Sequence, residues 1–170
     1  MGAENIPGIV ISQAARNIPH MFLTLSATYV GIAQGAYDFT VQYLRGEIPG
    51  AQGSKSRQHS AKQYTVAEMF IKLEQIRALF IRSIHEIMVN PEKPARLRAY
   101  ASQFTTMEGA VDICRLAVRT CGGRSMLKTY PLERMYRDSR CGSLMFPWTA
   151  EACLDRLGRE TLYEKGETDD

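Results

Sequence analysis

The chain has 170 residues, of which 45% are hydrophobic and 23% charged, a composition typical of one globular domain with a sizeable core. Its formal net charge is only +3 and its basic excess is confined to residues 115–140, so charge gives little support to nucleic-acid binding. No apolar run reaches the roughly 18 residues of a membrane span and the N-terminus does not resemble a signal peptide, so we expect a cytoplasmic protein.

The first long helix is predicted by apolar residues that recur every three or four positions from about Asn17 to Arg45. Residues 1–12 form a lead-in before it, and Pro19 suits its first turn. Glycine and proline then open a polar loop over 46–58, which we expect to be mobile. The apolar positions of this helix are Ile18, Phe22, Leu25, Tyr29, Ile32, Ala36, Phe39 and Tyr43.

Two further long helices follow the same spacing. We predict one over about 60–89, ended by Asn90 and Pro91, and another over about 94–121. Helices of about 28 residues joined by short loops favour an all-α, antiparallel up-and-down bundle whose apolar stripes form the core. These stripes are Val66, Met69, Leu73, Ile76, Phe80, Ile84 and Ile87 in one helix, and Leu97, Tyr100, Phe104, Met107, Val111, Cys114, Val118 and Cys121 in the other.

The last quarter of the chain predicts two shorter helices. One spans about 132–138, and the other begins near Trp148 or Thr149 and runs to about Tyr163. We expect this final helix to lie across the bundle or against a neighbouring subunit. The acidic tail, 164–170, is expected to fray. The apolar residues of the final helix are Ala152, Leu154, Leu157 and Leu162.

The cysteines and histidines do not point to a disulfide or a metal site. Cys114 and Cys121 lie about 10 Å apart along one predicted helix, which is too far for a disulfide. We expect reduced, mostly buried thiols. The histidines are scattered, and no metal-ligand, P-loop, Rossmann or nucleophile-elbow motif occurs. The remaining cysteines are Cys141 and Cys153, and the histidines are His20, His59 and His85.

The stretch from Arg119 to Arg140 gathers five arginines and one lysine around two glycines, Gly122 and Gly123. Glycines let a backbone approach a ligand, and helix-start N–H groups together with guanidinium groups suit phosphate. A helix C-cap followed by a solvated basic face has the same composition. From the residues alone, both interpretations remain open.

Three motifs stand out in order along the chain. They are Gly31-Ile-Ala-Gln-Gly-Ala-Tyr-Asp38, Tyr64-Thr-Val-Ala-Glu-Met69, and Gly122-Gly123 followed by Tyr130-Pro-Leu-Glu-Arg134 and Arg137-Asp-Ser-Arg140. Together they resemble the C-terminal helical domain of the acyl-CoA dehydrogenase family of flavoproteins, over nearly the whole chain. This resemblance implies an up-and-down bundle through which subunits assemble as dimers or tetramers. It also implies FAD bound between this bundle and a middle β-domain, with its ADP part touching the neighbouring subunit's bundle.

Members of that family also have an N-terminal helical domain and the β-domain, and the 170 residues hold no counterpart of either. We therefore expect residues 1–170 to be a single helical domain of a longer enzyme. One wall of the flavin site would then be missing, so the isolated domain is expected to be inactive and to bind FAD only together with the other domains and a neighbouring subunit.

The family's flavin-contacting residues carry over in part. In its Gln-x-x-Gly-Gly motif the two glycines match Gly122 and Gly123, whereas Arg119 stands in place of the glutamine. An arginine can pair with pyrophosphate. The family's Arg-x-x-Phe-Gly after the first helix has no good counterpart, and Arg45 is the candidate substitute, with Lys55 and Arg57 in the loop as alternatives.

The catalytic base of the family has no counterpart here. Dehydrogenation needs a carboxylate that removes the proton α to the thioester, and Phe146 occupies the position of that glutamate. Some members carry the base near the start of the first helix, where this chain has Met21 and Phe22. The nearest ionisable group is His20, either a general base or a surface histidine. Trp148 is expected to plug the active-site loop or to shape a different substrate pocket.

Several functions therefore remain open. The chain is expected to be part of an FAD-dependent oxidoreductase acting on CH–CH groups of an acyl-CoA or another small molecule, and to contribute FAD contacts and an oligomer interface. The alternatives are a flavin-dependent monooxygenase or oxidase of the same fold, a non-catalytic partner subunit, and a helical oligomerisation module. Arg137, Asp138 and Arg140 are interpreted as a structural ion-pair network or as catalytic groups.

Overall fold

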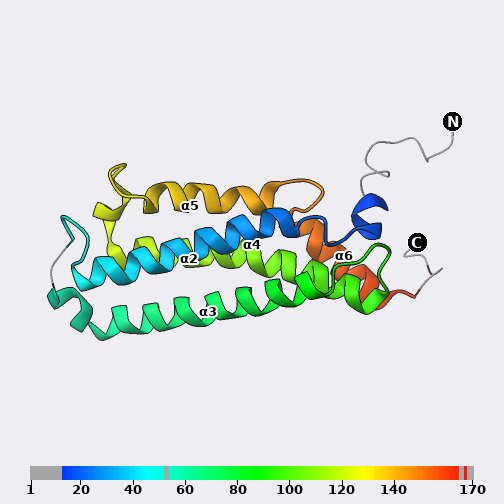
Figure 1. The fold of residues 1–170 in the computed structure, drawn as a ribbon, viewed down its shortest axis with the longest axis horizontal. Helices are drawn as coiled ribbons and strands as arrows, with labels where there is room; N and C mark the ends of the chain where they lie inside the picture. The colour runs from blue at the N-terminus through cyan, green and yellow to red at the C-terminus, as the bar shows by residue number, and fades with distance from the viewer. Residues whose placement is uncertain (1–12, 52–53, 165–166, 168–170) are drawn as a thin grey trace.

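The computed structural model describes residues 13–51, 54–164 and 167, and within these residues it is all-α. Two of the three long helices point the same way, and the middle one returns antiparallel to both (Figure 1). The prediction of an up-and-down bundle is therefore confirmed. The long helices are α2 (Leu23–Arg45), α3 (Ser60–His85) and α4 (Lys93–Cys121).

Two shorter helices complete the bundle. Helix α5 (Leu132–Cys141) lies alongside α2 and α4, and α6 (Ala150–Leu162) packs against α4 at the opposite end from the α4–α5 connector (Figure 1). The final helix thus lies on the bundle, which is one of the two arrangements expected from the sequence. Short 3-10 helices occupy the connections: η2 (Ser54–Gln58), η3 (Gly123–Met126) and η4 (Gly142–Leu144).

Helix α4 forms the centre of the core, because it packs against α2, α3, α5 and α6. Such a position needs apolar or small side chains around most of the helix, and alanine, methionine, isoleucine and cysteine supply them. One buried polar pair joins α2 to α4, where the Ser26 hydroxyl donates to Gln103 Oε1 at 2.8 Å. The buried apolar residues of α4 are Ala99, Tyr100, Met107, Ala110, Ile113, Cys114, Leu116, Ala117 and Cys121.

The first two helices are shorter than the apolar spacing predicts. Helix α2 begins at Leu23, not near Asn17, because the residue before Pro19 is disfavoured in α conformation. Residues 18–22 instead form a tight turn, in which Leu23 N donates to His20 O at 3.0 Å. Helix α3 ends at His85 rather than at Val89.

The chain after α3 makes a different tertiary contact. Asn90 adopts a left-handed conformation with φ 51°, and its N–H donates to Asn17 O at 2.7 Å. This contact ties the α3–α4 turn to the segment before α2. Periodicity along one helix does not predict such an interaction, which explains why the predicted end of α3 was four residues too late.

Part of the predicted core is on the surface. In α3, Met69, Leu73 and Ile76 are buried, but Ile84 is 43% exposed and Ile87, beyond the helix, is 58% exposed. Ile18 and Leu25 are also exposed. Further large apolar residues of α3 are exposed, and one of them, Phe70, also contacts Tyr37 of α2 with ring centroids 6.0 Å apart. The others are Tyr64, Ile71 and Ile81.

The two short helices differ from the prediction in detail. Helix α5 continues to Cys141, one turn beyond the predicted end. Helix α6 begins as predicted, with Thr149 as N-cap accepting from Ala152 N at 3.1 Å. Its Leu154 and Leu162 are exposed, because the side of α6 that faces α4 carries other residues. These are Cys153, Arg156, Leu157 and Glu160.

The close approach of Gly142 to the buried Tyr29 ring yields a stability prediction. A Cβ at Gly142 would lie 2.7 Å from Tyr29 Cζ, so Gly142→Ala should lower the free energy of unfolding by about 1–3 kcal/mol through overpacking. Urea unfolding measures this change. Gly158→Ala, in α6 with no atom within 4 Å of the new Cβ, is the control and should be neutral or stabilising by up to about 1 kcal/mol. Equal effects of the two substitutions would contradict the packing argument.

Candidate functional site

The predicted site residues separate into two groups at opposite ends of the bundle. Arg45 and Arg119 lie in the last turns of α2 and α4, which end at the same end of the molecule (Figure 1). His20 precedes α2 and Phe146 precedes α6, at the other end. The 29 residues of α4 separate the two ends by about 40 Å at 1.5 Å per residue. A single copy of this chain therefore does not bring the two groups together.

The glycine pair after α4 leaves open space beside the backbone. Gly122 has φ 83°, which favours glycine, and its N–H donates to Val118 O at 2.9 Å and so ends the helix. A Cβ at Gly122 or Gly123 would meet no atom within 4 Å. Ser125 holds the turn from the other side, because its hydroxyl donates to Gly122 O at 2.7 Å. This geometry allows a ligand to approach the backbone closely.

Several arginines lie at this end, among them Arg57, which lines a groove with Arg45, and Arg124, which sequence reasoning missed. Arg119 is exposed, whereas Arg45 forms an ion pair with Glu47 at 2.7 Å and is less available to an anion. Arg124, which directly follows the glycine pair, lines a groove of about 600 Å³ together with Gly50. Its position directly after the glycine pair could have identified it from the sequence.

The loop after α2 and the connector after α4 form this groove together. The Tyr130 hydroxyl donates to Pro49 O at 2.8 Å and joins the two segments. Gly50 has φ 79°, and a Cβ there would lie 2.7 Å from Tyr130 Oη and 3.4 Å from Arg124 Nη2. Only glycine therefore fits this close contact between loop and connector.

These features fit the pyrophosphate of a flavin dinucleotide. The backbone at Gly122 and Gly123 is open to a ligand, the nearby Arg119 is exposed, and Arg124 lines the groove. A guanidinium group binds phosphate through two parallel hydrogen bonds. Arg45 is the weakest of the predicted contacts, since Glu47 already pairs with it.

The other end is organised around an aromatic pair. Trp148 is only 1% exposed, and its ring centroid lies 5.2 Å from that of Phe22 at the start of α2. Phe146, two residues before Trp148 in the sequence, is 61% exposed. A phenyl ring accepts no proton, so Phe146 presents only an apolar surface to whatever lies next to it.

His20 is buried at the same end, so its interpretation as a surface histidine is wrong. Only 5% of the residue is exposed, and neither ring nitrogen has a hydrogen-bond partner within the described part of the chain. Burial lowers the pKa of His20, while the Met88 backbone and the Glu86 carboxylate act in the opposite direction and Arg98 adds to the lowering. Glu86 itself accepts from Arg98 at 2.8 Å.

Two arginines of the Arg-Asp-x-Arg motif form surface ion pairs. Arg137 pairs with Glu133 at 2.9 Å within α5, and Arg140 pairs with Glu108 of α4 at 3.5 Å. Both arginine side chains are more than half exposed, so each pair contributes little stability. These contacts support the structural interpretation of the motif.

The cysteine side chains are free thiols and most of them are buried, as predicted. All four cysteines are free, and Cys114, Cys121 and Cys153 are buried while Cys141 is exposed. Burial raises the pKa of each buried thiol to about 11, so these thiols remain protonated near neutral pH. Over the described residues, no three metal-ligating side chains gather, and no helix is long and apolar enough to cross a membrane.

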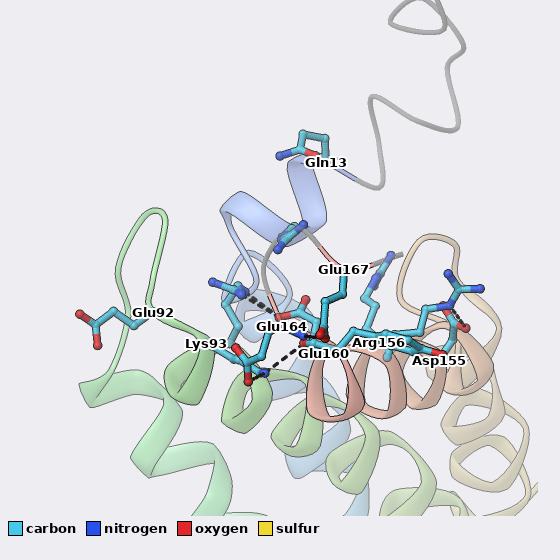
Figure 2. Close-up of a pocket in the computed structure, with 12 residues that line it drawn as sticks. Gln13, Glu92, Lys93, Asp155, Arg156, Glu160, Glu164 and Glu167 are labelled. Carbon is cyan, nitrogen blue, oxygen red and sulfur yellow. Dashed lines mark hydrogen bonds and ion pairs between the residues drawn. The ribbon is translucent and has the colours of Figure 1, made fainter. Parts of the chain in front are cut away.

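A cleft of about 930 Å³ lies between α6, the start of α4 and the segment before α2 (Figure 2). Its lining carries charges of both signs, and several of these charges pair with one another. Arg96 pairs with Glu160 at 2.8 Å and Lys93 with Glu164 at 3.0 Å. The paired lining gives the cleft no clear preference for an anion or a cation.

The buried His20 makes stability depend on pH. Its pKa is lower in the folded chain than the ordinary 6.5, so the unfolded chain binds the proton more readily and the free energy of unfolding falls as pH drops below 6.5. Urea unfolding at about pH 7.5 and pH 5.5 measures this loss, which should be smaller in His20→Leu. His85→Leu, at an exposed site in α3, is the control and should behave as the wild type. An equal loss in wild type and His20→Leu would contradict the lowered pKa.

Comparison with known proteins identifies the fold family. Residues 23–144 match the family model described as acyl-CoA dehydrogenase, C-terminal domain. The chain is 29% identical over 142 residues to the putative acyl-CoA dehydrogenase YdbM of Bacillus subtilis, covering 82% of this chain and 37% of that protein. It is 30% identical over 134 residues to the mitochondrial short-chain specific acyl-CoA dehydrogenase of Bos taurus, covering 79% of this chain and 32% of that protein.

The fold also resembles a solved flavoprotein. Nitroalkane oxidase matches with a TM-score of 0.74 at 18% identity, covering 87% of this chain and 35% of that one, which is a likeness of fold alone. The chain spans about a third of the length of the curated relatives it matches. Because the family model covers most of the chain, this protein belongs to the acyl-CoA dehydrogenase family, in the region of its C-terminal helical domain.

Proposed function

We propose that this chain is the C-terminal helical domain of an FAD-dependent oxidoreductase of the acyl-CoA dehydrogenase type, acting on CH–CH groups. The observation that carries the proposal is the family match over residues 23–144. The domain would work with an N-terminal helical domain and a β-domain, and its own roles would be flavin contact and subunit assembly. FAD, when bound, would accept a hydride from the substrate.

Flavin contact is assigned to the end of the bundle that carries the glycine pair. Arg119 and Arg124 would bind phosphate oxygens, and the backbone at Gly122 and Gly123 would allow close approach. The end of the bundle that carries Phe146 and Trp148 lies about 40 Å away in the same chain. The residues around the glycine pair would therefore contact the flavin of a neighbouring subunit.

Assembly is assigned to the apolar outer side of α3. Exposed apolar patches of this kind mark surfaces that bind other proteins. We propose a dimer or tetramer of identical chains, since most oligomers are symmetric. A full-length protein that sediments as a monomer would contradict this assignment. The exposed residues are Tyr64, Phe70, Ile71 and Ile81.

A second function is favoured by one observation, the phenylalanine at the position of the family's base. Phe146 cannot remove a proton, and His20 is buried with a lowered pKa. A flavin-dependent monooxygenase of the same fold, in which reduced flavin reacts with oxygen, would need no carboxylate at that position. Without bound flavin, the chain would instead be a partner subunit or an oligomerisation module.

The visible spectrum of the full-length protein, recorded anaerobically before and after addition of acyl-CoA thioesters, decides between these functions. The proposal predicts bound flavin that is bleached by at least one thioester. Flavin that stays oxidised would favour the monooxygenase or oxidase, and a preparation without flavin would contradict both.

A gain of function tests the role of position 146. Phe146→Glu restores a carboxylate where the family has its base, so the rate of flavin bleaching by acyl-CoA should rise by roughly 100-fold, the low end of the contribution of general base catalysis. The matched control is Leu144→Glu, which places a carboxylate on a side chain of similar exposure, 62%. Equal rates for both variants would show that position 146 does not face the substrate.

Removal of one guanidinium tests the flavin contact. Arg119→Ala should raise the dissociation constant for FAD roughly tenfold, since a hydrogen bond to a charged group contributes about 1.5–3 kcal/mol. Titration of the apoprotein with FAD measures this constant. Arg115→Ala is the control, because Arg115 lies one turn earlier on α4 and pairs with Asp112 at 3.4 Å. An unchanged affinity in Arg119→Ala would remove Arg119 from the site.

A further inference from the structure

Trp148, the single tryptophan of the chain, is held between two elements that are far apart in sequence. Phe22, at the start of α2, packs on it with ring centroids 5.2 Å apart. From α6, the Arg156 Cζ atom lies 5.3 Å from the Trp148 ring centroid. The residue is 1% exposed, so these neighbours enclose it.

Arg156 also contacts a second aromatic ring. Its Cζ lies 5.8 Å from the ring centroid of Tyr100 in α4, so the guanidinium group contacts two rings. Its Nη1 atom is buried and has no hydrogen-bond partner among the described residues. The residue as a whole is only partly buried and lines the cleft beside α6. The two aromatic rings therefore cover one side of the guanidinium group.

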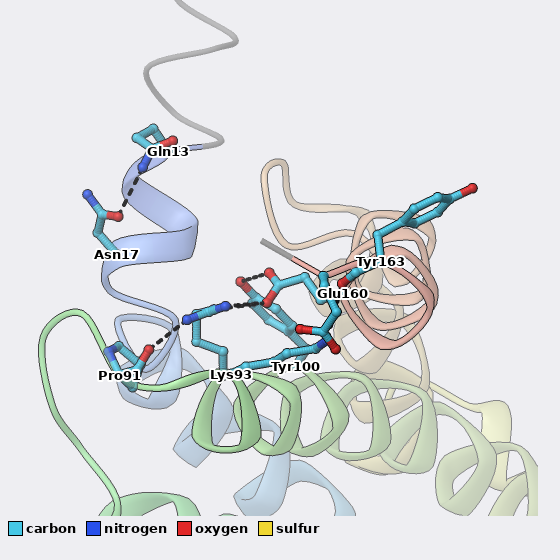
Figure 3. A network of polar contacts seen from close by, with 9 residues as sticks. Gln13, Asn17, Pro91, Lys93, Tyr100, Glu160 and Tyr163 are labelled. Atoms are coloured by element: carbon cyan, nitrogen blue, oxygen red, sulfur yellow. Dashed lines mark hydrogen bonds and ion pairs between the residues drawn. The ribbon is translucent and has the colours of Figure 1, made fainter. Parts of the chain in front are cut away.

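Tyr100 is itself fixed by a polar network (Figure 3). Its hydroxyl donates to Glu160 Oε1 at 3.3 Å, and Arg96 donates to the other oxygen of Glu160 at 2.9 Å and to Pro91 O at 2.7 Å. Burial, together with the Glu160 carboxylate, raises the pKa of Tyr100 to about 12, so the ring is a neutral phenol near neutral pH. The network supplies a rigid support behind Arg156.

The segment before α6 is attached to the bundle on both sides of Phe146. Gly142 lies against the Tyr29 ring and Met145 packs on the core, whereas Phe146 is 61% exposed. Trp148 is the attachment that follows Phe146, and its backbone N–H donates to Met145 O at 2.8 Å, which closes the turn. The position of Trp148 therefore fixes the chain on the C-terminal side of Phe146.

We propose that Arg156 is a positioning residue that holds Trp148 against Phe22 at the start of α2, and through Trp148 fixes the part of the segment 142–148 that carries Phe146. The inference rests on the proposed function only in placing this segment at the substrate site. A methionine at 156 would fill a similar volume, but it would lack the planar cation that stacks on both rings.

The single tryptophan gives a direct test in the 170-residue chain. In Arg156→Met, we expect Trp148 emission to shift to longer wavelength and its acrylamide quenching constant to rise at least about twofold, because the ring loses its stacking partner and becomes accessible. Far-UV circular dichroism should stay unchanged. Arg159→Met is the matched control on the same helix, with an exposed side chain near Asp155, and should leave the emission unchanged.

A second variant keeps the test decisive if Arg156→Met fails to fold. Arg156→Lys retains the charge but not the planar stacking, so it should shift emission and quenching in the same direction by a smaller amount. Wild-type emission and quenching in whichever of these variants is folded would overturn the proposal.

The consequence for chemistry is measured in the full-length flavoprotein. Arg156→Met should slow flavin bleaching by substrate at an unchanged flavin content, whereas Arg159→Met should not. An unchanged bleaching rate would overturn the positioning role. Absence of flavin from the wild-type protein would contradict the proposed function instead, and the fluorescence result would still decide whether Arg156 holds Trp148.

Discussion

The bundle depends on the burial of α4, because α2, α3, α5 and α6 all pack against it. A helix in that position must carry small or apolar side chains on several sides, and the alanines of α4 allow its neighbours to approach closely. Since α3 returns antiparallel between them, α2 and α4 end together. This topology places the basic connector beside the end of α2 and the aromatic pair beside its start.

Helix positions could be predicted from the sequence because apolar spacing records which side of a helix is buried. Several helix ends were predicted as well, such as those at Arg45 and Cys121, but the ends that depend on contacts between distant segments were not. The hydrogen bond from Asn90 N to Asn17 O is one example. The inner side of α6 was also unpredictable, since it is formed by Arg156 and Glu160, which sequence patterns assign to the surface.

The candidate site could also be predicted only in part. The glycine pair at Gly122 and Gly123 stands out in the sequence, and its open surroundings agree with a role in ligand contact. Arg124 was missed because its importance comes from the loop at Gly50, which packs against the connector only in the folded chain. The burial of His20 likewise results from the turn at residues 18–22, which no helical periodicity describes.

The separation of the two ends has a consequence for how the family can diversify. Sites that share no partner and lie tens of ångströms apart contribute independently to stability and binding, so their free energies add. A substitution at the aromatic end, for example at position 146, is therefore expected to leave the arginine and glycine end unaffected. In this way one scaffold can exchange the side chains of one end while those of the other end keep their role.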